Sequence, residues 1–309
     1  NRSEYQFLPQ ERSTALGLIN FALQLFSVFE GQEVDDFTTS MGGVSLTYIP
    51  DRDRNPIFLK LLASRFQSDE NETFDIIGRY SLRQIESDLG SDNFGEVLAE
   101  LGTGTQHEYV RNFFNADLTN VEHRGGVELQ LDPDDPDVVS SHFLQWSVKY
   151  QNEMIRDRIN EWERLDSAGY SLPFNPDSVL LFNVLKTENQ LNSNRFSAYF
   201  QDTYTFRKEG ISEWKISAGV RATYWDLNGE LNISPRVQFL YKPLAGTKDI
   251  SYRLAGGLYM QPPFYRELRD FNGNVNKNLL AQKSAHFVAG LTYDFYLGRR
   301  NPKKFRLIT

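Results

Sequence analysis

Apolar and polar residues alternate with a period of two along most of this chain, the spacing of side chains on the two faces of a β-strand. The segment from Trp214 to Tyr224 shows this most clearly. Every second residue, starting at Trp214 and ending at Tyr224, is apolar, and every residue between them is polar or small. The same alternation recurs in residues 196–206 and 285–295. The pattern therefore predicts an all-β chain made of amphipathic strands.

The length of the alternating segments points to strands that cross a membrane. Strands of soluble proteins are mostly about 5–6 residues long, whereas crossing a membrane takes about 9–11. Trp214 and Tyr224 are ten positions apart, which is roughly 33 Å along a strand. At a tilt of about 45° this becomes roughly 23 Å, close to the ~25 Å apolar band that separates two aromatic girdles in outer-membrane barrels. We therefore expect an antiparallel transmembrane β-barrel, or part of one.

About ten strands are expected, joined by short turns at one rim and long loops at the other, as in outer-membrane barrels. They are predicted at residues 38–50, 56–84 (with a β-bulge), 105–122, 140–165, 178–207, 213–227, 232–243, 250–261, 283–297 and from 303 onward. Short turns are expected at 51–55, 207–213, 243–249 and 298–302, and long loops at 86–105, 167–177 and 261–283. Two connections are exceptions: 228–232 is short on the side of the long loops, and 132–137 is a longer acidic connector on the other side. The first 30 residues are expected to form an external loop with one short helix.

One charged residue, Asp202, breaks the alternation by lying at an apolar position of the segment 196–206. A charge that faces lipid is least unfavourable near the membrane surface. We therefore expect Asp202 to lie near an interface or at a β-bulge, where an extra residue turns a side chain away from its regular direction.

Composition and charge narrow the function classes. The chain has 309 residues, 35.7 kDa, no cysteine and a formal charge of −8, with 41 Asp and Glu against 33 Lys and Arg. The absence of cysteine excludes a disulfide scaffold, a thiolate zinc site and cysteine catalysis. The acidic balance argues against a nucleic-acid partner. No run of residues reaches the roughly 18–20 apolar positions of a membrane helix.

The sequence offers no pattern of catalytic, cofactor-binding or metal-binding residues. The four histidines share no metal-ligand spacing, and the acidic run 132–137 lacks the glycine and terminal glutamate of a calcium loop, so we interpret it as a solvated turn. We expect no catalytic residue, no cofactor and no metal, and the chain is interpreted as a non-enzyme.

Two sets of residues are candidates for binding. Two prolines, Pro262 and Pro263, end a predicted strand and lead into a long loop. This loop either contacts a ligand or has only a structural role, packed at the mouth of the barrel. The candidate ligand-contact residues are Gln261, Phe264, Tyr265, Arg266 and Arg269. A second set lies at polar positions of predicted strands and would line a substrate path or contact a plug inside the barrel: Arg221, Arg236 and Gln238.

Several segments resemble one family of membrane proteins. Residues 195–204, 216–224, 234–243, 256–268 and 278–295 resemble the later barrel strands of TonB-dependent outer-membrane receptors. Residues 31–39, 120–125 and 166–173 look like the Bacteroidota-type members, which often carry an N-terminal carboxypeptidase-regulatory-like domain. The resemblance covers most of the chain, and the order of the motifs is more specific than any one of them.

The resemblance implies a barrel of about 22 strands in the outer membrane of a Gram-negative bacterium, closed around an N-terminal plug. It implies import of an external substrate with energy transmitted by TonB. The expected partners are outer-membrane lipid, the plug, TonB through an N-terminal part, and a substrate that stays open among siderophore, cobalamin, glycan and peptide. Residues 1–309 would be one partial barrel domain without the plug and the barrel ends, and no position matches the TonB-contact segment.

Two other functions stay open from the sequence. The chain could form an outer-membrane porin or a surface ligand-binding barrel without TonB coupling. The alternation of apolar and polar residues is the same in such barrels as in TonB-dependent transporters. It could also be a soluble all-β carbohydrate-binding module whose aromatic residues serve as sugar platforms. The long in-phase strands and the small residues on the apolar face argue against the soluble module.

Overall fold

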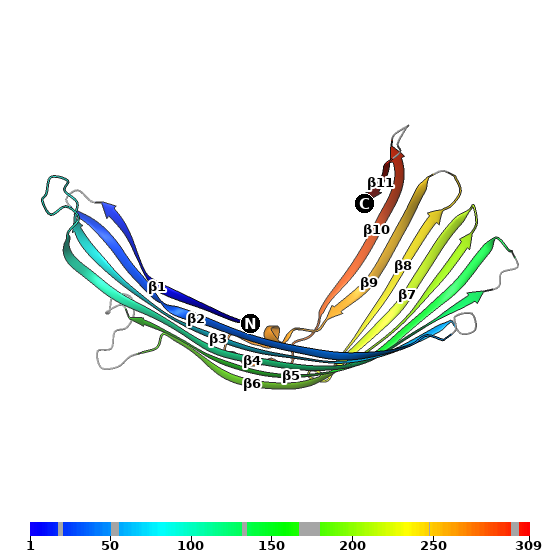
Figure 1. The fold of residues 1–309 in the computed structure, drawn as a ribbon, viewed down its shortest axis with the longest axis horizontal. Coiled ribbons are helices and arrows are strands. Elements are labelled where there is room, and N and C mark those ends of the chain that lie inside the picture. The colour runs from blue at the N-terminus through cyan, green and yellow to red at the C-terminus, as the bar shows by residue number, and fades with distance from the viewer. Residues whose placement is uncertain (18–20, 51–55, 132–134, 167–179, 247, 298–302) are drawn as a thin grey trace.

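The computed structural model describes residues 1–17, 21–50, 56–131, 135–166, 180–246, 248–297 and 303–309. These residues form one antiparallel sheet of 11 strands in sequence order, which confirms the all-β prediction. The sheet curves into an open trough (Figure 1). The strands are β1 (Arg2–Gly17), β2 (Phe21–Tyr48), β3 (Ile57–Glu86), β4 (Val97–Leu131), β5 (Val138–Asp166), β6 (Asn183–Lys208), β7 (Ser212–Trp225), β8 (Glu230–Pro243), β9 (Asp249–Gln261), β10 (Gln282–Leu297) and β11 (Lys303–Ile308). A short helix, α1 (Tyr265–Leu268), lies between β9 and β10.

The expectation for the first 30 residues is wrong, because β1 and the first part of β2 are strands rather than an external loop. β1 pairs along its whole length with β2, and its register shifts only between Phe7 and Gln10. Pro9 lies within that shift and has no N–H to donate to the ladder. β2 in turn pairs with β3 without a register shift. Backbone pairing with a long neighbouring strand thus organises a segment whose own alternation is weak.

The loop expected at 86–105 is also shorter than predicted, since β4 begins at Val97 and continues the pairing with β3. The bulge expected in residues 56–84 lies instead on the facing strand: the register shifts after Leu82 and after Gln84 leave the extra residues, Leu101 and Leu98, on β4. The short connections after β6 and β8 and the long one after β9 lie where they were expected. The turns expected at 51–55 and 298–302 and the loop at 167–177 lie outside the described residues.

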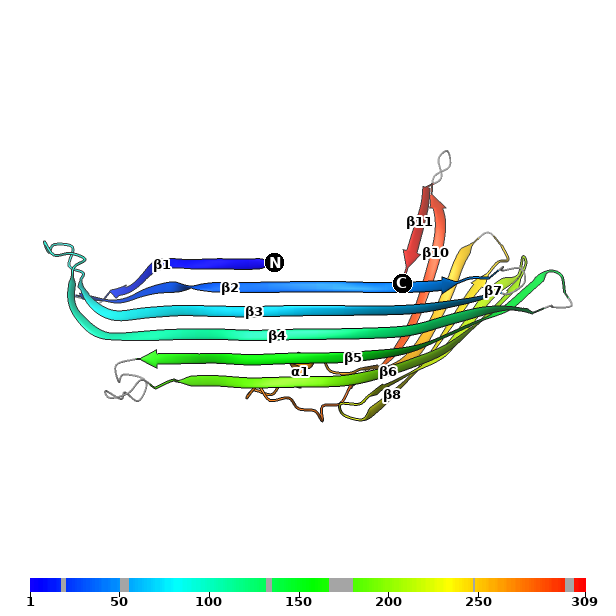
Figure 2. The ribbon, with the colours of Figure 1, turned by 60° about the horizontal axis from the view of Figure 1, so that its bottom comes forward.

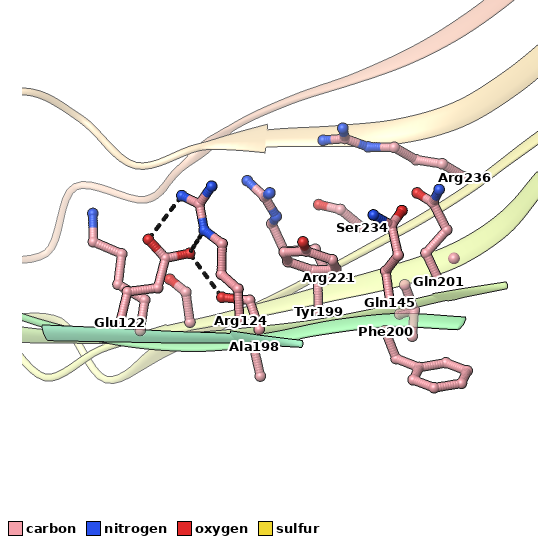
Figure 3. Close-up of a pocket in the computed structure, with 15 residues that line it drawn as sticks. Glu122, Arg124, Gln145, Ala198, Tyr199, Phe200, Gln201, Arg221, Ser234 and Arg236 are labelled. Carbon is pink, nitrogen blue, oxygen red and sulfur yellow. Dashed lines mark hydrogen bonds and ion pairs between the residues drawn. The ribbon is translucent and has the colours of Figure 1, made fainter. Parts of the chain in front are cut away.

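The two faces of the sheet differ in polarity, as the alternation predicts. Polar side chains such as Tyr199, Arg221 and Arg236 project from the concave face, whereas Phe200 points to the opposite side (Figure 3). β2–β6 extend far beyond the ends of β7–β10 (Figure 2). The sheet is therefore tall at β2–β6 and short at β7–β10. Over the short strands, one face is polar and the other is apolar.

Asp202 does not lie at a bulge, because β6 pairs with β5 and with β7 without a register shift. The carboxylate is instead paired: Asp202 Oδ2 lies 2.8 Å from Nδ1 of His142 on the neighbouring strand β5. The imidazole of His142 also contacts the ring of Tyr204, with 4.8 Å between centroids. A histidine on the next strand therefore gives the carboxylate of Asp202 a hydrogen-bond partner at an otherwise apolar position.

The His142–Asp202 pair gives a test of this interpretation. Substituting His142→Ala removes the hydrogen-bond partner of Asp202 Oδ2, and we expect a loss of about 1–3 kcal/mol in the free energy of unfolding. The double variant His142→Ala/Asp202→Ala should recover part of that loss, because no unpaired carboxylate then remains. Urea unfolding followed by circular dichroism measures both. A double variant less stable than His142→Ala would contradict the interpretation.

Candidate functional site

The long connection between β9 and β10, residues 262–281, folds onto the concave face of the sheet (Figure 1). We call this segment the inward loop. Its helix α1 begins directly after Pro262 and Pro263, which end the ladder of β9. The Glu267 side chain accepts a hydrogen bond from the backbone N–H of Phe264 at 2.8 Å and so caps the N-terminus of α1.

Apolar packing holds α1 against the long strands. Leu268 is 1% exposed and Tyr265 is buried. Both belong to a cluster with residues of β4, β5, β6 and β7: Ala116, Ile155, Leu191 and Trp225. Because the sheet is a single layer, this cluster forms the main apolar core of the described residues. The inward loop therefore supplies the second layer that the concave face needs for a core.

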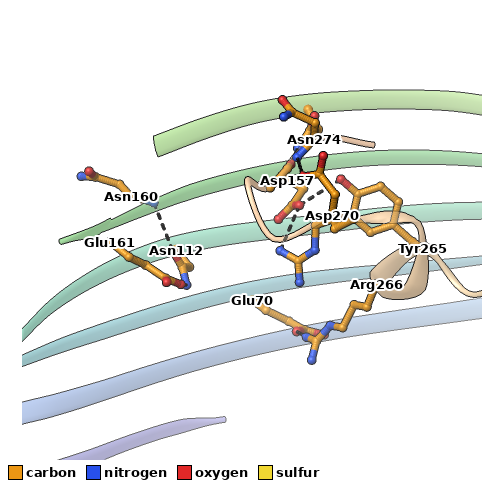
Figure 4. A network of polar contacts seen from close by, with 12 residues as sticks. Glu70, Asn112, Asp157, Asn160, Glu161, Tyr265, Arg266, Asp270 and Asn274 are labelled. Carbon is orange, nitrogen blue, oxygen red and sulfur yellow. Dashed lines mark hydrogen bonds and ion pairs between the residues drawn. The ribbon is translucent and has the colours of Figure 1, made fainter. Parts of the chain in front are cut away.

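A buried carboxylate, Asp157 on β5, accepts two hydrogen bonds from the inward loop. Its Oδ2 lies 2.9 Å from the Tyr265 hydroxyl and 3.2 Å from Arg269 Nη1 (Figure 4). Asp157 is 4% exposed, so loss of either donor would leave a buried acceptor short of a partner. Burial, and then the hydrogen bond to Asp157, raise the pKa of Tyr265, which keeps its hydroxyl a donor.

Further contacts fix the rest of the inward loop. The Gly273 carbonyl accepts a 2.7 Å hydrogen bond from Asn189 Nδ2 on β6. Gly273 has a φ of 78°, and a Cβ at this position would lie 2.8 Å from the side chain of Thr187, so both the turn and the close approach require glycine. The end of the loop is held by Asn228, whose Nδ2 donates to the Leu279 carbonyl at 2.9 Å.

The structure places the five candidate loop residues in different environments. Tyr265 and Arg269 meet on Asp157, and Arg266 forms an exposed ion pair with Glu70 on β3 at 3.0 Å (Figure 4). An exposed pair of this kind contributes little stability. Phe264 is 62% exposed, and Gln261 is the last residue of β9. Contact of these residues with a ligand stays a prediction.

The second candidate set lies in and beside a polar pocket of about 480 Å³ on the concave face. Arg221 and Arg236 project into this pocket from β7 and β8 (Figure 3). Gln238, two residues after Arg236, lies on the same face of β8. Side chains from β4, β5 and β6 complete the lining, among them Glu122, Arg124, Gln145, Ser147, Lys149, Tyr199 and Gln201. Nothing in the local sequence pattern of these residues indicates which inner positions share one pocket, so the sequence alone does not predict them.

Two arginines of the polar pocket lack an acidic partner. The carboxylate of Glu122 accepts hydrogen bonds from Arg124, at 2.6 and 2.9 Å, and from the Ser147 hydroxyl, at 2.8 Å. Arg221 instead lies over the ring of Tyr199, 5.6 Å from its centroid, and Arg236 lies over Tyr259 at 4.2 Å. Within the part of the chain that the structure describes, neither guanidinium forms an ion pair with a carboxylate.

The absence of a side chain at Gly257 makes room for the side chain of Arg236. Gly257 on β9 is directly opposite Arg236 on β8. A Cβ at Gly257 would lie 2.9 Å from Arg236 Cγ. The missing side chain therefore lets the stem of Arg236 lie across β9, so that its guanidinium reaches Tyr259.

Comparison of the chain with protein-family models, with curated proteins and with solved structures finds no match. No helix in the described ranges is long and apolar enough to span a membrane. Over the same ranges, no group of three or more histidine, aspartate or glutamate side chains is arranged to hold a metal ion.

The bonds to Asp157 predict how firmly the inward loop is held. Asp157→Asn removes the charge that Arg269 and Tyr265 share, so the loop should open more often and trypsin should cleave after Arg266 or Arg269 about tenfold faster. Tyr265→Phe should have a smaller effect, since only one hydrogen bond is lost. The matched control is Asp92→Asn, an exposed carboxylate in the β3–β4 connection. Cleavage of Asp157→Asn at the control rate would contradict the role of Asp157.

Proposed function

We propose that the chain forms part of the β-barrel wall of a TonB-dependent outer-membrane transporter, which binds an external substrate and imports it with energy transmitted by TonB. The observation that carries the proposal is an exposed apolar band on the convex face. The band is continuous from β5 to β10, and its large exposed members are Val148, Tyr150, Phe196, Phe200, Val220, Tyr224, Leu231, Ile233, Val237, Phe239, Tyr241, Tyr252, Leu254, Leu258 and Phe287.

The exposure of this band is unusual for a surface that faces water. Val237 is 51% exposed and Phe287 is 87% exposed. Soluble monomers seldom show a contiguous apolar patch of more than a few hundred Å², and this band crosses six neighbouring strands. A lipid surrounding makes such a face favourable, because its apolar side chains are then removed from water.

Aromatic residues mark the two limits of the band. One row comprises Tyr150 and Phe196, whose ring centroids are 5.3 Å apart, with Tyr224 opposite Phe196 in the ladder. The other row includes Phe206, Trp214, Tyr241 and Tyr252. Trp214 and Tyr224 lie on one face of β7, ten residues apart. With the usual tilt, this separation fits the ~25 Å apolar band between two aromatic girdles.

Polar residues replace apolar ones directly beyond the first aromatic row. Asn152 on the convex face of β5 donates hydrogen bonds to Asn192 and Asn194 on β6, each at 3.0 Å. On β3 and β4, Arg65 pairs with Asp117, and this pairing lowers the pKa of the Asp117 carboxyl. The parts of β3–β6 beyond these residues would stand outside the membrane, in line with external loops taller than the periplasmic turns.

The open sheet fits a wall that belongs to a larger barrel. The outer edges of β1 and β11 face no further strand in the described structure. At the level of the apolar band, the unpaired edge on the first side is that of β2, because β1 pairs only with residues 22–36 of β2. Unpaired backbone groups are costly in hydrocarbon, so the proposal places further strands beside this part of β2 and beyond β11. The concave face, with Arg221, Arg236 and Gln238, then faces the barrel interior, where the resemblance places a plug or a substrate path.

Direct tests distinguish the transporter proposal from the two alternative functions, an uncoupled barrel and a soluble β module. Uptake that survives collapse of the proton gradient would favour a porin or a surface-binding barrel without TonB coupling. Recovery of the full-length protein in the soluble fraction would favour a soluble β module, whose convex face would then be covered by protein.

An adjacent pair of substitutions on β8 tests the membrane location of the band. Val237→Arg places a charge on the convex face, where at the bilayer midplane it is unfavourable by about 2–4 kcal/mol. Gln238→Arg places the same charge on the concave face, at an exposed position that is already polar. We expect Val237→Arg to lower the amount of protein extracted from washed membranes by detergent, and Gln238→Arg to leave it unchanged. Equal yields of the two variants would contradict a lipid-facing band.

A further inference from the structure

We propose that the polar pocket binds a small solute that carries carboxylate or phosphate groups, with Arg221 and Arg236 as its principal contacts. The pocket lining contains four cationic side chains, those of Arg124, Lys149, Arg221 and Arg236, and one carboxylate, that of Glu122. The chain as a whole has a formal charge of −8. The pocket is therefore a cationic site on an acidic protein, which favours an anionic occupant.

The charges of the pocket are unequally compensated. Arg124 donates two hydrogen bonds to the carboxylate of Glu122. Lys149 Nζ donates one hydrogen bond to the side chain of Gln151, at 3.1 Å. In the described residues, the guanidinium groups of Arg221 and Arg236 lie over aromatic rings and form no ion pair with a carboxylate. A ring holds the plane of a guanidinium and leaves its N–H edges free, and those edges match the two oxygens of a carboxylate or phosphate.

The register of the sheet brings these two arginines to one place. Arg221 is opposite Ser234, and Arg236 is opposite Gly219, so the two arginines are diagonal neighbours on β7 and β8. Diagonal neighbours on one face are about 7–8 Å apart. Their side chains both rise from the concave face into the pocket (Figure 3). Two oxyanion groups on the same solute could therefore each be held by one of the two guanidinium groups.

The rest of the lining and the size of the pocket favour a small solute over a segment of protein. A volume of about 480 Å³ lies within the range of about 300–1,000 Å³ that is typical of small-molecule sites. Gln145 and Gln201 add amide groups, and Tyr199 adds an aromatic face. An acidic protein segment that lies along the concave face is the other occupant that this charge pattern could fit, and the experiment below separates the two.

This inference does not depend on the proposed membrane location, because it rests on the concave face alone. Binding can be measured with the purified full-length protein whether the protein is extracted in detergent or recovered in solution. A failure of the transporter proposal would therefore show in fractionation, and a failure of this inference would show in binding.

Isothermal titration with citrate and with inorganic phosphate tests the inference. We expect at least one of the two anions to bind the unmodified protein, with an affinity that falls as salt is raised, and glucose not to bind. Arg221→Gln and Arg236→Gln should each weaken binding about tenfold or more, since each removes a charge-assisted contact. The double variant should show no measurable binding.

The control is Arg253→Gln on β9, an exposed arginine at an inner position outside the pocket lining. It changes the net charge by the same amount, and we expect it to leave the affinity unchanged. Equal weakening by Arg253→Gln and Arg221→Gln would overturn the inference in favour of diffuse attraction of anions to the face. Absence of binding for both citrate and phosphate would also overturn it, and would leave an acidic protein segment as the occupant to test.

Discussion

A sheet that is one layer thick needs a suitable environment for each of its faces, and most features of this structure follow from that constraint. Where the strands pair, their backbone groups are satisfied within the sheet, so the side chains decide what each face contacts. The alternation gives one polar and one apolar face over the short strands β7–β9. A conventional soluble fold would bury the apolar face in a second layer. Here the large apolar side chains of the convex face are exposed, and the second layer lies on the polar side.

The inward loop shows why the second layer can lie on the polar side. Along the tall part of the wall, several inner positions of β4–β6 are apolar or small, as at Ala116, Ile155 and Leu191, and the loop covers these positions. Asp157 gives the loop a definite position, since its one carboxylate receives both the Tyr265 hydroxyl and the Arg269 guanidinium. Nearer the short strands, the concave face stays uncovered and carries the polar pocket. The two regions thus divide the inner face into a packed part and an open, cationic part.

The sequence predicted those elements whose information is local. The alternation from Trp214 to Tyr224 located β7 to within two residues at each end, and the same signal located β8, β9 and β10. It failed for β1, whose strand depends on pairing with β2 rather than on its own pattern. The alternation also identified Arg221, Arg236 and Gln238 as inner-face residues. It could not identify Asp157 or Asn189 as partners of the inward loop, because these residues are about 100 positions away and become neighbours only through the register of the sheet.

The central claim is that lipid covers the convex face and water reaches the concave face. These 309 residues contain no cysteine, so a cysteine introduced among them is the one thiol in this part of the protein. Adjacent pairs are Gln201 and Phe200 on β6, and Ser217 and Ala218 on β7, with the first member of each pair on the concave face. In native membranes, a water-soluble maleimide should label cysteine at positions 201 and 217, and should label positions 200 and 218 only after denaturation. Equal labelling of both members of each pair in native membranes would contradict the account.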